Sequence, residues 1–280
     1  NISNANNEYY TRQRVVIGTN APLTGVTPGD VGQGSQAVTI QRVTDEFVYK
    51  RYRDALGDSS YYGMMQETLQ EVSKYFPDME RVGLQNDLAV YFKSWQSFAQ
   101  NPNDTSQKVA LARNAETLAT SIRSLSDSLE TIQQSLNDRM ESMTSEINNY
   151  TRRIAEINAR ITSAESDGAS NANDLRDERD KLETALTKLI APTITKDNIL
   201  SDVNNQSVAP KKENYVLQIG GFTLVDGSAS HDLKLKADPD SPEGFYNLYY
   251  ERQDHVLFNA SEGIKGGQMG ALFDLRGSII

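Results

Sequence analysis

Apolar residues recur along the middle of the chain at spacings of four and three residues, which is the seam pattern of a coiled-coil helix. The seam consists of Leu118, Ile122, Leu125, Leu129, Ile132, Leu136, Met140, Met143, Ile147, Tyr150, Ile154, Ile157 and Ile161. No proline or glycine interrupts residues 104–164. The pattern predicts one helix over this range, about 90 Å long at 1.5 Å per residue. Such a seam needs partner helices to cover it.

Two local features refine the prediction for the long helix. Asp104, with Gln107 three residues later, matches the capping-box pattern at a helix start. The steps from Ile132 to Leu136 and from Leu136 to Met140 are both four residues, which makes a stutter. We expect the helix to bend or to change its packing partner near Leu136.

Helical spacing predicts two shorter helices before the long one. The first begins at 44–46, where Thr44 can cap it, and ends at Pro77. Gly57 and Gly63 lie inside it, where glycine can bend a helix. We expect this helix to be one of the partners that cover the long seam.

The other predicted partners lie on either side of the long helix in the sequence. A helix at 85–100 carries Trp95 among aromatic residues, which we expect to form core. A helix at 171–190 has a leucine face that can lie antiparallel on residues 150–161. The four helices predict an elongated bundle.

After Pro192 the apolar period changes from 3.6 to 2, which indicates β-structure. Gly220-Gly221 has the pattern of a two-residue hairpin turn. The predicted strands lie at 193–195, 215–219, 222–225, 232–236, 245–250 and 256–258. Residues 266–276 predict a turn into a further helix. Near the beginning, residues 38–43 alternate as in a strand or extended arm, after a turn-rich connector.

These patterns predict four parts. Residues 1–43 form an extended segment that packs on the bundle, 44–191 a helical bundle domain, 192–262 an outer β domain, and 263–280 a return to the helical domain. The predicted fold class is mainly α: an elongated antiparallel helical bundle with a very long central helix, plus an appended small β domain.

Charge and composition restrict the classes of partner. The chain has 28 Lys and Arg against 38 Asp and Glu, a formal net charge of −10. Nucleic acids and anionic membranes require clustered Lys and Arg, so neither is expected as a partner. No apolar run approaches the ~18 residues of a membrane span. The absence of cysteine removes disulfides, thiol nucleophiles and thiolate metal sites.

Catalytic and metal-binding patterns are weak. The two histidines, His231 and His255, lack a second ligand at helical spacing, and no G-x-S-x-G nucleophile elbow occurs. The acidic loop 238–244 lacks the ligand alternation of a calcium loop. The mixed charges of residues 174–181 are expected on the outer surface of their helix. We therefore predict no catalytic site, cofactor or metal.

The first residues, NISNANNEYYTRQRVV, resemble a signature of bacterial flagellar rod, hook and hook-associated proteins, N-I-A-N-x-N-T-x-G-Y-x-R. Asn4, Asn6, Tyr10 and Arg12 stand in register with it. Tyr9 replaces a glycine of that pattern, so the local turn is expected to differ. The later segments EINNYTRRIAEINARI, the β segment and GGQMGALFDLR narrow the resemblance to the hook-associated proteins of the hook–filament junction.

The resemblance implies a structural role, as an adaptor subunit that joins hook to filament by packing rather than catalysis. It implies a ring of copies, with hook protein on one side and the next hook-associated protein on the other. It also implies type III export to the extracellular flagellum. Expected subunit-contact residues are Asn4, Asn6, Tyr10, Arg12 and Arg14. The family's terminal axial helices are expected to flank this chain, which should be largely monomeric alone.

Two alternatives compete with this interpretation. The β domain could be an adhesion or glycan-binding module on a helical stalk, which exposed aromatics at Phe245, Tyr246, Tyr249 and Tyr250 would favour. At period 2, about half of these must face the core instead. The second alternative is a hook subunit, but hook proteins are mostly β and lack a helix of this length.

Overall fold

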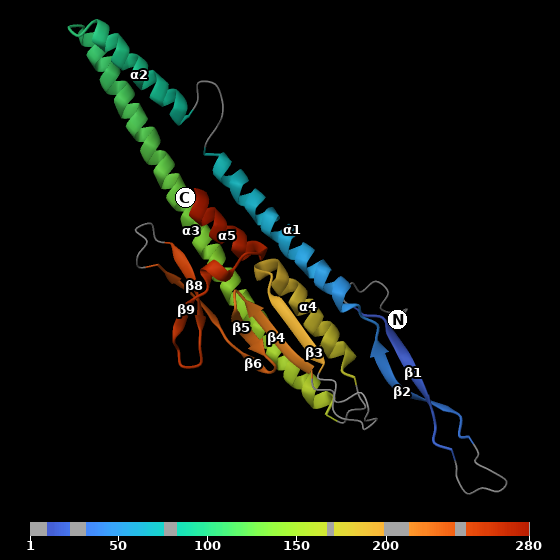
Figure 1. The fold of residues 1–280 in the computed structure, drawn as a ribbon. Helices are drawn as coiled ribbons and strands as arrows, with labels where there is room; N and C mark the ends of the chain where they lie inside the picture. The colour runs from blue at the N-terminus through green and yellow to red at the C-terminus, as the bar shows by residue number, and fades with distance from the viewer. Residues whose placement is uncertain are drawn as a thin grey trace, which may run out of the picture.

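The long helix predicted from the seam dominates the molecule. A computed structural model describes residues 10–22, 32–75, 83–166, 171–198, 213–238 and 245–279. In it, α3 (Thr105–Ala164) is one uninterrupted helix of 60 residues. The other elements are arranged along α3 (Figure 1), which gives the molecule its elongated shape.

Only half of the predicted capping box forms at the start of α3. The Asp104 carboxylate accepts a hydrogen bond from the backbone N–H of Ser106 at 2.7 Å. The N–H of Asp104 itself donates to the carbonyl of Asn101 at 3.1 Å. Because this turn already occupies the N–H that Gln107 would have to reach, the reciprocal bond of a capping box is not needed.

The described residues form four further α-helices: α1 (Glu46–Ser73), α2 (Leu84–Gln100), α4 (Asn173–Ile190) and α5 (Gly267–Ile279). Here α1 and α2 follow one another alongside α3 (Figure 1). Most of the packing on α1 comes from α4 and α5, whereas α2 packs on the first half of α3. The expectation that α1 covers the long seam directly was therefore wrong, because the C-terminal helix α5 occupies that position.

Residue-level predictions for α1 need two corrections. Asp45, not Thr44, caps the helix, because its carboxylate accepts hydrogen bonds from the N–H groups of Phe47 and Val48 at 3.0 and 3.1 Å. The helix continues through both glycines. A Cβ on Gly57 would lie 2.9 Å from the Cβ of Ala191, so this glycine permits close packing on the end of α4. Pro77, the predicted helix end, lies outside the described residues.

Burial along α3 changes at the stutter. Upstream, Ile122 is 48% exposed, whereas from Ile132 and Leu136 onward the seam is almost fully buried. The packing partner changes over the same region, from α2 to α4, α5 and the β-strands. The predicted change of partner near Leu136 is therefore confirmed, and it takes place without a break in the helix.

The β-structure forms three antiparallel sheets: a two-stranded sheet in the order β1-β2, a four-stranded sheet β3-β4-β5-β6 and a three-stranded sheet β7-β8-β9. The strands are β1 (Gln13–Thr19), β2 (Ser35–Arg42), β3 (Thr193–Asn198), β4 (Glu213–Ile219), β5 (Phe222–Asp226), β6 (Ala229–Ser230), β7 (Leu233–Ala237), β8 (Tyr246–Glu251) and β9 (Leu257–Asn259). A 3-10 turn (Ser261–Gly263) follows.

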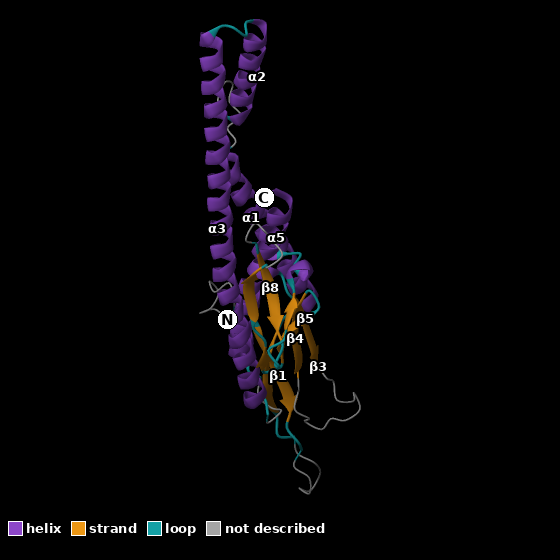
Figure 2. Ribbon diagram, turned by 90° about the vertical axis from the view of Figure 1, so that its left-hand side faces the viewer, coloured by secondary structure: helices purple, strands orange, loops and turns teal. Residues whose placement is uncertain are grey.

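All six strands predicted after Pro192 are present, with ends shifted by a few residues. Gly220 and Gly221 have φ of 51° and 87°, and both lie in the left-handed region that a tight hairpin turn favours. Figure 2 shows the two larger sheets packed beside the lower half of α3. Their buried side chains, including Leu217, Leu224 and Leu248, form one core with those of α3, α4 and α5.

The N-terminal segment forms a hairpin that the sequence predicted only in part. β2 covers the strand expected at 38–43, while β1 was not assigned. Val15 pairs with Ile40, and a bulge follows at Val38. The hairpin lies beside the N-terminal end of α4 and points away from the start of α1 (Figure 1).

Candidate functional site: a contact hairpin and the charged network behind it

Three of the five predicted subunit-contact residues can be placed. Tyr10 is half-buried at the start of the hairpin, and Arg12 and Arg14 are exposed. The Arg14 guanidinium donates to the side-chain oxygen of Gln41 at 3.2 Å. Asn4 and Asn6 lie outside the described residues, as does Tyr9. Their contact role stays a prediction.

The base of the hairpin is fixed to the first turns of α4. The Arg42 guanidinium pairs with Asp177 at 2.8 Å and with Asp180, and it donates to the hydroxyl of Thr11 at 2.8 Å. The Asn173 side-chain amide donates to the backbone carbonyl of Ile40 at 3.0 Å. Because these contacts come from the inner end of each strand, they set the direction in which the hairpin leaves the body.

The same face of α4 continues into a buried charged network. Arg179 pairs with Glu213 of β4 at 2.9 Å and donates to Asn158 of α3 at 2.7 Å. Glu183 is fully buried, with Arg53 of α1 at 2.6 Å. One network therefore ties together α1, α3, α4 and the four-stranded sheet.

Two further cations close this network. Lys196 of β3 bridges Asp180 at 3.0 Å and Glu183 at 2.9 Å, so the hairpin anchor and the network share Asp180. Arg176 pairs with Glu165 at 2.8 Å and also with Glu213. Each buried carboxylate thus faces at least one cation, as its desolvation requires.

This network overturns the prediction that the charges of residues 174–181 lie on the outer surface. Asp174 and Lys181 are exposed, but Arg179 is only 2% exposed. The reason is tertiary. α4 is covered by α3, α1, the hairpin and β3, so a helix with one leucine face is enclosed on several sides.

The network shifts the pKa values of its members. Burial alone would raise the pKa of Glu213, but Arg179 and Arg176 outweigh that effect and hold this pKa below its ordinary value. Burial would likewise raise the pKa of Asp180. Lys196 and Arg42 outweigh this effect, so the pKa of Asp180 is also lowered. Burial raises the pKa of Asp177, because Arg42 offsets its desolvation only in part.

Aromatic rings complete the surroundings of the network. The Arg179 guanidinium lies 4.6 Å from the ring centroid of Tyr215, and the Arg53 guanidinium lies 4.8 Å from that of Tyr49. Burial and the nearby Glu183 raise the pKa of Tyr215 well above its ordinary value. The cluster is a packing unit in which cations and carboxylates are paired with one another.

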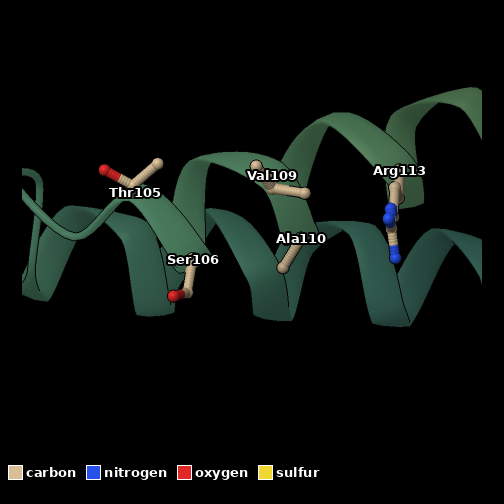
Figure 3. Close-up of a pocket in the computed structure, with 5 residues that line it drawn as sticks. All are labelled: Thr105, Ser106, Val109, Ala110 and Arg113. Atoms are coloured by element: carbon tan, nitrogen blue, oxygen red, sulfur yellow. The ribbon is translucent and has the colours of Figure 1, made fainter.

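Other candidate positions offer little chemistry. A shallow pocket of about 390 Å³ lies at the first turns of α3, lined by Thr105, Ser106, Val109, Ala110 and Arg113 (Figure 3). Within the described residues, no group of three or more His, Cys, Asp or Glu is placed to hold a metal ion. No helix in the same part of the chain combines the length and apolar character that a bilayer crossing requires.

A family model described as the flagellar hook-associated protein FlgK helical domain matches residues 69–280. The chain belongs to this family. Membership in the FlgK helical domain family confirms the resemblance inferred from the sequence.

Individual relatives of the FlgK family match nearly the whole chain. Flagellar hook-associated protein 1 of Salmonella typhimurium (strain LT2) is 26% identical over 277 residues, which are 99% of this chain and 48% of that protein. The Bacillus subtilis (strain 168) protein of the same name is 26% identical over 254 residues, 87% and 50% of the two chains. The chain therefore spans about half the length of the curated relatives it matches.

A solved structure supports the same fold. The flagellar hook junction protein FlgK from Burkholderia pseudomallei aligns with a TM-score of 0.62 and 25% identity, over 81% of this chain and 38% of that one. The mainly α fold with a long central helix and small antiparallel sheets is thus shared with a FlgK protein.

Two aromatic clusters lie differently from expectation. Trp95 is 45% exposed and Phe92 63% exposed, so the cluster on α2 is not core as predicted, because within the described residues α2 packs mainly on α3. On β8, and at Phe245 just before it, the aromatic residues Phe245, Tyr246, Tyr249 and Tyr250 are all half-buried. Tyr250 stacks on Phe222 at 5.2 Å between ring centroids. No exposed aromatic platform for a glycan forms there.

Sequence reasoning missed Arg42, Arg53, Glu183 and Glu213 as functional residues. The only local signal was the i, i+4 pair of Arg179 and Glu183 inside a leucine-rich helix. Such pairs are common on exposed helices, so the partners on β2, α1 and β4 could not be inferred without the tertiary structure.

Proposed function

We propose that the protein is a structural subunit of the bacterial flagellum that joins hook to filament by subunit packing and has no catalytic activity. The observation that carries this proposal is the FlgK family match over residues 69–280, together with relatives named flagellar hook-associated protein 1. Since the chain spans about half of those relatives, the role belongs to the longer protein of which this chain corresponds to a part.

The architecture is suited to such a role. A 60-residue helix supplies axial stiffness, and the buried network fastens two further helices, α1 and α4, and a sheet to it. The hairpin leaves the body at one end, with Arg12 and Arg14 accessible to a neighbour. We infer that residues 1–43, including Asn4, Asn6, Tyr10, Arg12 and Arg14, contact neighbouring copies in a ring, and that 192–262 face outward.

The partners would be hook protein on one side and the next hook-associated protein on the other. The location would be the extracellular flagellum, reached through the flagellar type III export apparatus. An elongated adaptor whose buried charges are paired with one another fits assembly better than substrate binding. The half-buried aromatics of β8 argue against an adhesion module.

Deletion of the gene tests this proposal. Cells without it are expected to retain hooks but shed their filaments, and the wild-type gene should restore them. Purified full-length protein should decorate the distal ends of isolated hooks, whereas the 280-residue chain should not. A deletion strain that keeps full filaments on its hooks would refute the junction role.

A further inference from the structure

The β1–β2 hairpin is joined to α1 by a short exposed link. The link consists of Val43, Thr44 and Asp45, and all three residues are exposed. The backbone N–H of Val43 donates to the carbonyl of Arg12 at 2.8 Å, a bond that closes the base of the hairpin itself. An exposed link has few packing contacts, so this one does not by itself fix the direction in which the hairpin leaves the body.

Two asparagine side chains hold β2 at one point. The amide of Asn171 donates to the hydroxyl of Thr39 at 2.6 Å and to the carbonyl of Ile40 at 3.1 Å. The amide of Asn173 donates to the same Ile40 carbonyl at 3.0 Å. Because these bonds meet at adjacent residues, and two of them at one oxygen atom, they fix the position of β2 but leave its angle open.

Arg42 supplies the contact that fixes the angle. Its guanidinium pairs with Asp177 at 2.8 Å and with Asp180, and it donates to the Thr11 hydroxyl at 2.8 Å. We call these four residues the Arg42 clasp. The two carboxylates lie three residues apart, on one face of α4. A planar guanidinium that contacts both of them sets an angle as well as a distance.

The clasp is attached to the rigid part of the molecule through Asp180. One carboxylate oxygen of Asp180 faces Arg42, and the other accepts a hydrogen bond from the Lys196 ammonium at 3.0 Å. Lys196 is itself held by the fully buried Glu183 at 2.9 Å. Since the Asp180 carboxylate is held from both sides, a change in the angle of the hairpin would have to break the contact with Arg42.

Arg42 is enclosed by its own chain. Its side chain is 11% exposed, whereas Arg12 and Arg14 on the same hairpin are exposed to a neighbour. We infer that Arg42 is a positioning residue for the subunit contact: it sets the angle at which the hairpin meets a neighbouring copy, without touching that copy. This rests on the proposed function, in which residues 1–43 contact neighbouring copies in a ring.

A fixed angle is important for a contact that repeats around a ring. A closed ring requires every copy to present its contact surface in the same orientation. A hairpin that is already oriented also loses less conformational freedom when it binds. Loss of the clasp should therefore weaken assembly even though every residue on the exposed surface of the hairpin is retained.

Distances between two spin labels test the role of Arg42, because the chain has no cysteine of its own. Gln36→Cys near the far end of β2 and Lys188→Cys on α4 place both labels at exposed positions. Double electron–electron resonance on the 280-residue chain is expected to give one narrow distance distribution. Arg42→Gln should widen this distribution at least about twofold. The matched control, Arg14→Gln, should leave it unchanged, because the Arg14 guanidinium contacts Gln41 within the hairpin.

Two further variants separate positioning from a simple loss of stability. Arg42→Gln combined with Asp177→Asn removes the ion pair without leaving that carboxylate buried and unpaired, while Asp180 keeps Lys196. This pair should widen the distance distribution, while the urea midpoint of unfolding stays close to that of the labelled parent chain. Arg42→Lys keeps the charge but not the planar fork, so it should give an intermediate width.

The same Arg42→Gln change in the full-length protein tests the consequence for assembly. It should lower the fraction of hooks that carry filaments by about half or more, because each contact must then order the hairpin as it forms. A broad distribution in the parent chain, a narrow one in Arg42→Gln, or an equal widening in Arg14→Gln would overturn the positioning role. Full filament retention despite a widened distribution would also overturn it. These results leave the junction role standing, whereas filaments retained after deletion of the gene refute that role itself.

Discussion

At the residue scale, the charged network shows how the cost of burying a charge is compensated. Arg179 is nearly inaccessible, yet its guanidinium contacts Glu213, Asn158 and the ring of Tyr215. The pairing compensates for desolvation, but replacing both ions by apolar residues could be equally stable. What the network supplies is therefore specificity: α4 can fit between α1 and the sheet in one register.

Breaking the network from one side is expected to be costly. Arg179→Met keeps the apolar stem but leaves Glu213 and Glu183 facing fewer cations, so the free energy of unfolding should fall by about 3–5 kcal/mol. Urea denaturation followed by circular dichroism measures this loss. Arg160→Met is the control, since Arg160 is exposed and its ion pair with Glu178 is long, at 4.0 Å. Its free energy of unfolding should stay within about 0.5 kcal/mol of that of the unchanged protein. Similar losses in both variants would contradict the network's importance.

Acid should weaken the protein through the same residues. The pKa values of Glu213 and Asp180 are lower in the folded protein than in the unfolded chain. Both carboxylates therefore stabilise the fold at pH values above their ordinary pKa, and this stabilisation is lost as the pH falls through their pKa values in the folded protein. The raised pKa of Asp177 acts in the opposite sense. The free energy of unfolding should therefore decline below roughly pH 4.

A neutral substitution separates Glu213 from other carboxylates in this acid response. Glu213→Gln should be less stable at neutral pH but should lose less stability on acidification. The measurement is urea denaturation at a series of pH values, with Glu156→Gln, an exposed change on α3, as the control. If the free energy of unfolding of Glu213→Gln falls with pH as steeply as that of the unchanged protein, Glu213 does not contribute to the loss of stability in acid.

At the element scale, the spacing of apolar residues predicted the helices and strands, because these depend mainly on the nearby sequence. The seam specified α3 to within one residue, and period-2 alternation located six of the seven strands described after Pro192, all but the two-residue β6. Contacts between distant segments were not predictable in this way. Arg179 is buried because several other elements enclose α4, and Trp95 is exposed because, among the described elements, α2 packs mainly on α3.

Gly57 and Gly63 of α1 allow the difference between local and tertiary effects to be measured. Both interrupt helical propensity equally in the sequence, but a Cβ on Gly63 would meet nothing within 4 Å, whereas one on Gly57 would lie 2.9 Å from Ala191. Gly63→Ala should therefore raise the free energy of unfolding by up to about 1 kcal/mol. Gly57→Ala should lower it, because overpacking costs about 1–3 kcal/mol.

Thermal and urea denaturation of both alanine variants, compared with the unchanged chain, give the two signs. Stabilisation by both substitutions would mean that α1 does not pack closely on the end of α4. In that case Gly57 would be an ordinary helical glycine, and α1 would have to sit differently on α4 and α5.

At the scale of the whole molecule, stiffness follows from how the partners of α3 are distributed. Its first half has α2 as its main partner, and its second half shares one core with α4, α5 and the sheets. The molecule is thus a rod with a thick end and a thin end. The exposed apolar positions on α2, on α1 and on the hairpin are spread along this rod.

The rod shape gives a test that depends on no single residue. A compact domain of 280 residues would have a radius of gyration near 19 Å. A uniform rod as long as α3, about 90 Å, has a radius of gyration of about 26 Å. Small-angle X-ray scattering of the 280-residue chain should therefore give the larger value, with a forward scattering that corresponds to a 31.1 kDa monomer. A value near 19 Å would mean that α2 and the first half of α3 fold back on the body. A dimer mass at low concentration would mean that the exposed surfaces associate without the rest of the flagellum.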